Sequence, residues 1–146
     1  MRRGGSDYTA SLIGAAILAD EVQIWTDIDG MHNNDPRIVT GTKPIANLSF
    51  DEAAELAYFG AKILHPQSVL PAKKFNVPVR LLDTMTPKAL GTLISSETNS
   101  KNQIVAVAAK DGITAIRIQS SRMLMAYGFL RKVFEVFERY KTPIDM

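Results

Sequence analysis

The sequence predicts an α/β fold that is built from two unequal units. Three observations lead to this prediction. Helical and strand-like segments alternate along residues 1–95, which is the rhythm of a sheet covered by helices. Residues 96–102, Ser-Glu-Thr-Asn-Ser-Lys-Asn, are small and polar and have the composition of a linker. A shorter pattern of two strands and one helix then occupies residues 103–146.

The composition is that of an ordinary globular protein. The 146 residues are 46% hydrophobic and 22% charged, so a packed core is expected. A net charge of +2 gives no support for a nucleic-acid or anionic-membrane partner, and no apolar run approaches the roughly 18 residues of a spanning helix. The absence of cysteine excludes disulfides and thiolate metal sites. We therefore expect a cytoplasmic protein.

A glycine-rich turn opens the first unit. Arg3-Gly4-Gly5-Ser6-Asp7 runs directly into the apolar segment Tyr8–Ala19. Ser6 or Asp7 can cap a helix there through a side-chain oxygen, and free N–H groups at the helix start favour an anion. The alternative is a capped helix with nothing bound. The pattern is neither a P-loop nor a complete G-x-G-x-x-G motif.

An acidic loop follows the first predicted strand, Val22–Trp25. The stretch Thr26–Arg37 contains three aspartates, Asp27, Asp29 and Asp35, and is interrupted by Gly30 and Pro36. Glycine and proline favour a tight loop, and loops at the carboxyl ends of strands commonly bind ligands. The acids and Arg37 suit a polyanion with its metal, whereas the alternative is a solvated acidic hairpin.

The remainder of the first unit alternates between helices and strands. Residues 38–45 form a connector, and Ser49 with Glu52 forms a capping box for a helix that Gly60 ends. Lys62 follows that glycine and either reaches a bound phosphate or is an ordinary surface lysine. We expect His65 to pack or cap, and Pro71 to end or kink the next helix. Residues 77–82 and 91–94 read as strands.

The second unit repeats the pattern on a smaller scale. Residues 104–108 and 113–118 are predicted strands, and Gly128 opens a helix. Apolar side chains recur on that helix at three- and four-residue steps, which predicts a buried stripe: Leu130, Val133, Phe134, Phe137 and Tyr140. Residues 143–146 resemble the start of another strand, so the unit looks incomplete.

Four motifs in this order resemble the aspartokinase family, most closely the lysine-sensitive type. They are Arg3–Ala10, Trp25–Asp27, Asn34–Arg37 and Phe59–Pro66. The resemblance implies transfer of the ATP γ-phosphate to the side-chain carboxylate of L-aspartate, with Mg²⁺. It also implies that residues 1–95 are the C-terminal part of an amino-acid-kinase αβα sandwich. Residues 103–146 would then begin a ferredoxin-like ACT domain that binds effector amino acids and builds a homodimer.

The resemblance also implies a role for individual residues. Asp7 matches a position that organises the catalytic lysine, and Arg3 and Ser6 match positions that hold aspartate. Nucleotide contacts are implied for Thr26, Asp27, His32, Arg37, Lys62 and Ile63, although the family often has tyrosine at His32. Effector contacts are implied for Met123, Gly128, Phe129, Leu130 and Asp145. Ala126 stands where lysine-sensitive relatives can carry serine, so the identity of the effector stays open beyond an expectation of lysine.

One departure from the family sets an expectation about activity. The family's Lys-Phe-Gly-Gly-Thr-Ser segment, which supplies the catalytic lysine, is absent, and Arg2 replaces a glycine. The chain therefore resembles the middle of an aspartokinase, and we expect no catalysis from it alone. Alternatives are a non-catalytic amino-acid-sensing or assembly subunit and a kinase for glutamate or a carbamate, which Arg3–Asp7 and the ACT-like tail disfavour. A parent that also carries a homoserine dehydrogenase stays open.

Overall fold

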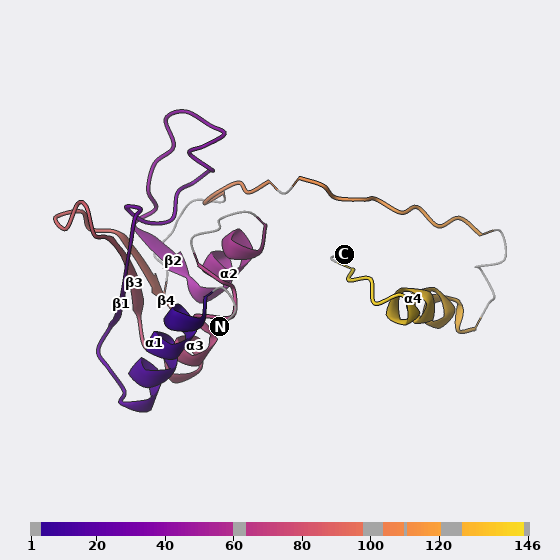
Figure 1. Ribbon diagram of the computed structural model, residues 1–146, viewed down its shortest axis with the longest axis horizontal. Helices are drawn as coiled ribbons and strands as arrows, with labels where there is room; N and C mark the ends of the chain where they lie inside the picture. Colours follow the sequence, from indigo (N-terminus) through magenta and orange to yellow (C-terminus); the bar gives the residue numbers. More distant parts are fainter. Residues whose placement is uncertain (1–3, 60–63, 98–103, 110, 121–126, 145–146) are drawn as a thin grey trace. The chain divides into compact units, whose positions relative to one another are not determined.

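The computed structural model describes residues 4–59, 64–97, 104–109, 111–120 and 127–144 (Figure 1). The chain divides into two compact units, Met1–Asp111 and Gly112–Met146. Within the described residues, the first unit contains a four-stranded sheet and three helices, and the second contains one helix. This mixed architecture confirms the predicted α/β class. None of these helices combines the length and apolarity that crossing a bilayer requires.

Helix α1 (Gly5–Ala16) begins at the glycine-rich turn. Gly4 is its N-cap in the left-handed region, with φ of 79°, and no side chain caps the helix. The predicted cap at Ser6 or Asp7 is wrong because the helix begins before either residue, and the Ser6 hydroxyl instead donates to Asp7 Oδ1 at 3.2 Å. A Cβ atom on Gly4 would lie 2.6 Å from Cβ of His65. His65 is exposed and its Nδ1 accepts the Gln67 N–H at 3.3 Å, so the structure supports the capping role, one of the two roles predicted for it.

The sheet has the strand order β1 (Val22–Thr26), β3 (Val79–Asp83), β4 (Thr92–Ser95) and β2 (Asn47–Ser49). β1 is parallel to β3, β3 is antiparallel to β4, and β4 is parallel to β2. The carboxyl ends of β1 and β3 therefore share one end of the sheet with the amino ends of β4 and β2. The sequence did not predict β2, because three residues are too few to show alternation.

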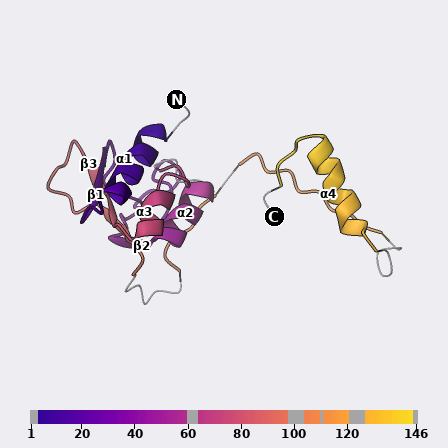
Figure 2. The same cartoon turned by 90° about the horizontal axis from the view of Figure 1, so that it is seen from below.

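Two helices test the predicted start and stop signals. In α2 (Phe50–Phe59) the Ser49 N–H donates to Glu52 Oε2 at 2.7 Å and the Glu52 N–H donates to Ser49 Oγ at 3.1 Å, which confirms the capping box. In α3 (Leu70–Phe75), Pro71 lies in the first turn, so it opens the helix and does not end or kink one. α1 packs against α3 and β1, and α2 packs against β2 and β4 (Figure 2).

The hydrophobic core reaches beyond the regular elements. Its fully buried side chains include Leu48, Val79, Leu81 and Ile94 from the strands. Met31, in the loop after β1, is also fully buried. Val105, which follows the polar linker, packs against the same cluster while partly buried. The core therefore anchors the long loop and the 104–109 segment.

The second unit differs from the prediction in its strands and in its burial. Helix α4 (Phe129–Arg139) starts after Gly128, whose φ of 76° confirms the predicted start. Residues 113–118 form no strand, and neither do residues 104–108 in the first unit, because no other part of the described chain forms a β-ladder with them. No residue of α4 is buried, so the prediction that its apolar stripe lies in a core is wrong for these residues. Among the described residues of this unit, no strand supplies a sheet face to cover the stripe.

Candidate functional site

The loop between β1 and β2, residues 27–46, extends from the end of the sheet and is fixed at its base (Figure 1). The Met31 N–H donates to Thr92 Oγ1 at 2.8 Å, and the Thr92 hydroxyl donates to the Ile45 carbonyl oxygen at 2.7 Å. The Ile45 N–H in turn donates to the Met31 carbonyl oxygen at 2.7 Å. Thr92 is fully buried, so its hydroxyl satisfies two loop groups that water does not reach.

Gly30 allows this closure. Its φ is 131°, a conformation that L side chains rarely adopt. A Cβ atom there would lie 2.5 Å from Thr92 Oγ1, which is closer than real contacts allow. Glycine is therefore required for both conformation and space.

The two arms of the loop are joined by polar contacts. The Asn33 N–H donates to the Lys43 carbonyl oxygen at 3.0 Å, and the Lys43 N–H donates to Asn33 Oδ1 at 2.9 Å. The half-buried His32 ring lies 2.9 Å from Thr42 Oγ1 through Nδ1 and 2.7 Å from Asp29 Oδ1 through Nε2. His32 thus holds the arms together, and its implied nucleotide contact stays a prediction.

Asp35 and Arg37 form an ion pair at the tip of the loop. The Arg37 backbone N–H and its Nε both donate to Asp35 Oδ1 at 2.9 Å. The side-chain hydrogen bond to Asp35, and then the charge of Asp35, raise the pKa of Arg37 above its ordinary value. The guanidinium therefore keeps its charge at every physiological pH, and the carboxylate orients it.

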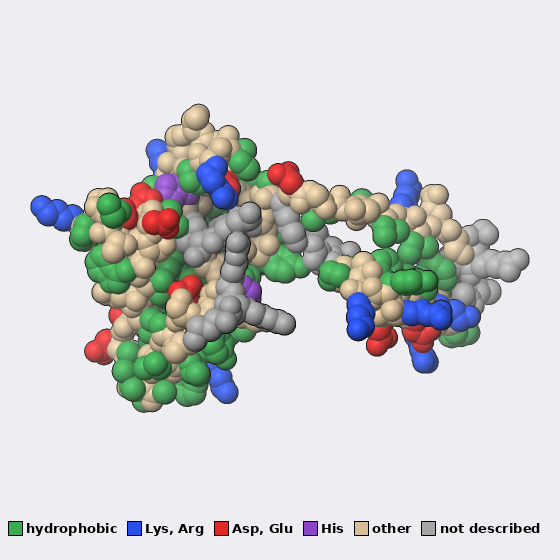
Figure 3. Space-filling view, in the orientation of Figure 1, with side chains coloured by type: hydrophobic (Ala, Val, Ile, Leu, Met, Phe, Trp, Pro, Cys, Tyr) green, Lys and Arg blue, Asp and Glu red, His purple; other side chains and the backbone are tan. Residues whose placement is uncertain are grey.

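A cavity of about 500 Å³ lies beside this loop. Figure 3 shows acidic side chains next to a histidine on this part of the surface. Four residues implied in nucleotide binding line the cavity: Thr26, Asp27, His32 and Arg37. The Thr26 hydroxyl donates to Asp27 Oδ1 at 3.1 Å. The structure therefore brings these four residues to one hollow, as the loop motif predicted.

Sequence reasoning missed several other lining residues. Leu56 from α2 and residues 107–109 complete the wall of the cavity. No motif marked them, because alanine, valine and leucine in these segments read as ordinary apolar positions. The buried Thr92 was detectable only as a polar residue within a buried strand.

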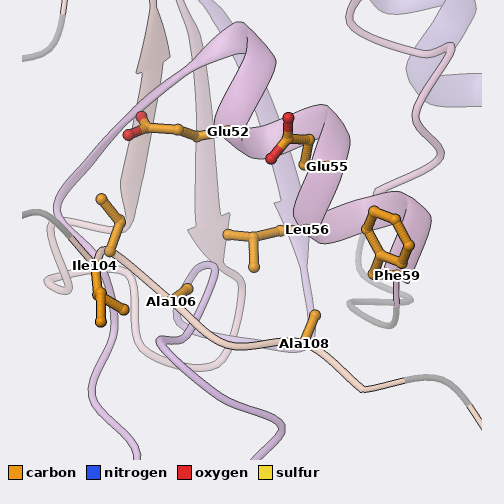
Figure 4. A pocket seen from close by; sticks show the side chains of 8 residues that line it. Glu52, Glu55, Leu56, Phe59, Ile104, Ala106 and Ala108 are labelled. Atoms are coloured by element: carbon orange, nitrogen blue, oxygen red, sulfur yellow. The ribbon is translucent and has the colours of Figure 1, made fainter.

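A second cavity, of about 430 Å³, lies between α2 and residues 104–108 (Figure 4). Glu52, Glu55 and Phe59 line it from the helix. Leu56 points from α2 toward the segment that carries Ala106 and Ala108 (Figure 4). Leu56 and Ala108 line both cavities and therefore form the partition between them.

The other implied residues fall into two groups. Asp7 is half-buried and Ser6 is exposed on the first turn of α1, and neither lines the loop cavity. Gly128 and Leu130 are exposed at the start of α4, where Phe129 is partly exposed. Arg3, Lys62, Ile63, Met123 and Asp145 lie outside the described residues.

The carboxylates of the loop bear on whether Mg²⁺ can bind there. The described residues contain no group of three His, Asp or Glu side chains able to hold a metal by themselves. Asp29 and Asp35 are already paired with His32 and Arg37. Mg²⁺ at phosphate sites commonly takes one or two carboxylates and completes its shell with phosphate oxygens and water. The loop therefore fits a Mg²⁺ that arrives with a nucleotide, with Asp27 as the carboxylate nearest in chain to β1.

Comparison with known proteins shows the family. The model of the amino acid kinase family matches residues 1–83, more than half of the chain. The chain belongs to the amino acid kinase family. It is 48% identical over 145 residues to the chloroplastic aspartokinase 3 of Arabidopsis thaliana, and 42% identical over 144 residues to the lysine-sensitive aspartokinase 3 of Escherichia coli. These relatives confirm the resemblance to aspartokinases.

Solved structures agree with this family assignment. Escherichia coli aspartokinase III in complex with aspartate and ADP is similar with a TM-score of 0.79 and 40% identity, over 99% of this chain and 32% of that one. Clostridium acetobutylicum aspartate kinase has a TM-score of 0.84 and 32% identity, over 100% of this chain and 34% of that one. The two sequence relatives are likewise covered over 26% and 32% of their lengths, and each covers 99% of this chain. The chain thus spans about a third or less of the proteins that it resembles.

Proposed function

We propose that this chain supplies the nucleotide-binding part and an effector unit of an aspartate kinase. The observation that carries the proposal is the cavity at the end of β1, where Thr26, Asp27 and Arg37 face one hollow. A loop that is locked at its base and presents a hydroxyl, a carboxylate and a permanent cation suits a nucleotide. The similarity to aspartokinases supports aspartate as the acceptor.

The proposed reaction moves one phosphoryl group. An oxygen of the aspartate side-chain carboxylate bonds to the γ-phosphorus of ATP. The bond from that phosphorus to the oxygen bridging the β-phosphate breaks, and ADP leaves with the electron pair. The protein's part is to position the groups and to compensate charge.

Each residue then has a distinct task. Arg37 offers its guanidinium to phosphate oxygens, while Asp35 keeps the side chain in place. The Thr26 hydroxyl and the Asp27 carboxylate order the nucleotide and its bound water, with His32 holding the loop. Mg²⁺, when bound with the nucleotide, adds positive charge against the phosphates. Lys62 and Ile63 complete the nucleotide contacts in this proposal.

The aspartate side of the site rests on α1. We assign Arg3 and Ser6 to hold aspartate, because a guanidinium and a hydroxyl suit a carboxylate at a helix start. Asp7 orients the catalytic lysine, which the family carries on a segment that this sequence does not contain. We therefore expect no aspartate-dependent ADP formation from the chain alone.

In this proposal, regulation belongs to the C-terminal part of the chain. Residues 103–146 begin an ACT domain that binds an amino-acid effector, lysine first among the candidates, through Met123, Gly128, Phe129, Leu130 and Asp145. Paired ACT domains would build a homodimer. The protein would act in the cytoplasm at the first step of lysine, threonine and methionine synthesis.

Nucleotide binding provides the first test. Trp25 is the single tryptophan, is 47% exposed and directly precedes Thr26. We expect its fluorescence to change saturably with MgADP. A response to amino acids but none to MgADP would contradict the kinase proposal and favour a non-catalytic sensing subunit.

Catalysis is tested in a chimera. Residues 1–146 replace the matching segment of Escherichia coli lysine-sensitive aspartokinase 3, and aspartyl phosphate is trapped as its hydroxamate. We expect aspartate-dependent product, a loss of about 100-fold or more with Asp7→Asn, and little change with Asp20→Asn, an exposed aspartate on the turn after α1. A folded chimera without activity would contradict the proposed reaction.

A further inference from the structure

Residues 104–109, called the strap below, contact three parts of the first unit within five residues. Val105 packs against the hydrophobic core. The Val107 N–H donates to the Asn33 carbonyl oxygen at 2.9 Å. Ala108 lines both cavities, facing Leu56 of α2. The strap is therefore anchored in the core and bonded to the loop that borders the candidate nucleotide site.

Asn33 is the point at which the strap meets the two arms of that loop. Its N–H and its Oδ1 bond to Lys43, while its carbonyl oxygen accepts from Val107. The neighbouring His32 and Asn34 both line the nucleotide cavity. A displacement of the strap would move Asn33. Because both chain neighbours of Asn33 line the cavity, the movement would reach the cavity wall.

We infer that Val107 is a positioning residue, whose backbone N–H holds the 27–46 loop in the conformation that binds nucleotide. The inference rests on the proposed function for its ligand, but the contact itself lies within the described residues. Its side chain is 57% exposed, so the contribution comes from the backbone hydrogen bond and little from burial. The strap thereby forms a wall of the site and also fixes the arm of the loop that carries Asn33.

The test separates the hydrogen bond from the side chain. Val107→Pro removes the N–H donor, while Val107→Ala retains it and trims the partly exposed side chain that lines the cavity. Ala106→Pro is the control for proline itself, because no described residue accepts a hydrogen bond from the Ala106 N–H. All variants are made in the 146-residue chain, and melting temperatures are measured alongside.

Two readouts are measured on these variants. Hydrogen exchange of residues 30–37 is followed without ligand, and the MgADP dissociation constant is taken from Trp25 fluorescence. We expect Val107→Pro to speed exchange about fivefold and to weaken MgADP binding by a similar factor, as one backbone hydrogen bond predicts. Ala106→Pro should stay within about twofold of the parent chain in both measurements, and Val107→Ala should do so in hydrogen exchange, which reports on the backbone contact and not on the side chain that lines the cavity.

Several outcomes would overturn the inference. One is unchanged exchange in Val107→Pro, and another is an equal increase in Ala106→Pro. If Val107→Pro does not fold, Val105→Ala is used in its place, because it loosens the core anchor of the strap and keeps every backbone N–H. Unchanged hydrogen exchange of residues 30–37 in Val105→Ala would then overturn the inference. If the parent chain binds no MgADP, the proposed function fails, while the exchange data still decide the role of the strap.

Discussion

The two units of this chain carry similar local signals but reach different degrees of burial. In residues 1–111, glycine-led turns, a capping box and alternating strands converge on a core that contains Leu81, Ile94 and Met31. In residues 112–146, Gly128 starts a helix with an apolar stripe just as clear, but no residue of α4 is buried. Periodicity determines which face of an element is apolar. Burial requires a second surface to cover that face.

The largest expected effect contrasts one apolar residue from each unit, the buried Leu81 and the exposed Phe134. Leu81→Ala removes a fully buried side chain in the central strand β3 and should lower the free energy of unfolding by about 3 kcal/mol. Phe134→Ala removes a side chain that is 52% exposed on α4 and should change it by less than about 0.5 kcal/mol. Urea unfolding of both variants measures the difference. Equal losses would mean that α4 is packed in solution, which would contradict the contrast between the units.

The hydroxyl of Thr92 provides the next largest effect. Thr92→Val leaves the Met31 N–H and the Ile45 carbonyl without a partner inside the core, at a cost of about 2–3 kcal/mol. Thr92→Ser keeps the hydroxyl and is the matched control, with an expected cost of about 1 kcal/mol for the lost methyl. Unfolding free energies measure both, and exchange of residues 30–37 should rise only in Thr92→Val. A loss in Thr92→Ser as large as in Thr92→Val would show that the hydroxyl does not fix the loop.

Ser49 and Ser6 were both predicted as helix caps, but only Ser49 forms one in the structure. Ser49→Ala removes a hydroxyl that accepts the Glu52 N–H and should destabilise the first unit by about 1 kcal/mol. Ser6→Ala should change stability by less than about 0.3 kcal/mol, because α1 has no side-chain cap. Thermal unfolding at matched concentration distinguishes them. A comparable loss at Ser6 would restore the cap that the sequence predicted and the structure does not contain.

The sequence predicted the features that depend on neighbouring residues and missed those that depend on long-range contacts. The capping box, the Gly128 start of α4 and the strands β1 and β3 depend on neighbours in the chain, and the sequence predicted them. The gathering of Thr26, Asp27 and Arg37 was predicted because one loop carries all three. Thr92 and Val107 were missed because their partners are 61 and 74 residues away, and no local pattern encodes such contacts.

The strands predicted at 104–108 and 113–118 failed for a related reason. Residues 113–118 alternate as a half-buried strand should and residues 104–108 are a short apolar run, but a strand also requires a neighbour to accept its hydrogen bonds. Within the described chain Val107 finds one such acceptor, Asn33, and residues 113–118 find none in a ladder. Whether a segment becomes a strand is therefore decided by what lies beside it.

The smallest expected effect concerns the stability of helix α4, which has no buried residue. Arg131 Nε donates to Glu135 Oε1 at 2.8 Å, an i,i+4 pair on the exposed surface of the helix. Exposed pairs of this kind contribute about 0.3–0.5 kcal/mol and weaken with salt. Glu135→Gln should therefore lower the helical circular-dichroism signal slightly at low salt and very little at 1 M salt.

The exposed pair Lys73–Asp51 in the first unit is the control. Because α4 has no buried residue, the Arg131–Glu135 pair carries a larger share of the stability of its helix than Lys73–Asp51 does in the first unit. Asp51→Asn should accordingly leave the helical signal unchanged, and an equal response to both substitutions would show that the two units hold their helices in the same way.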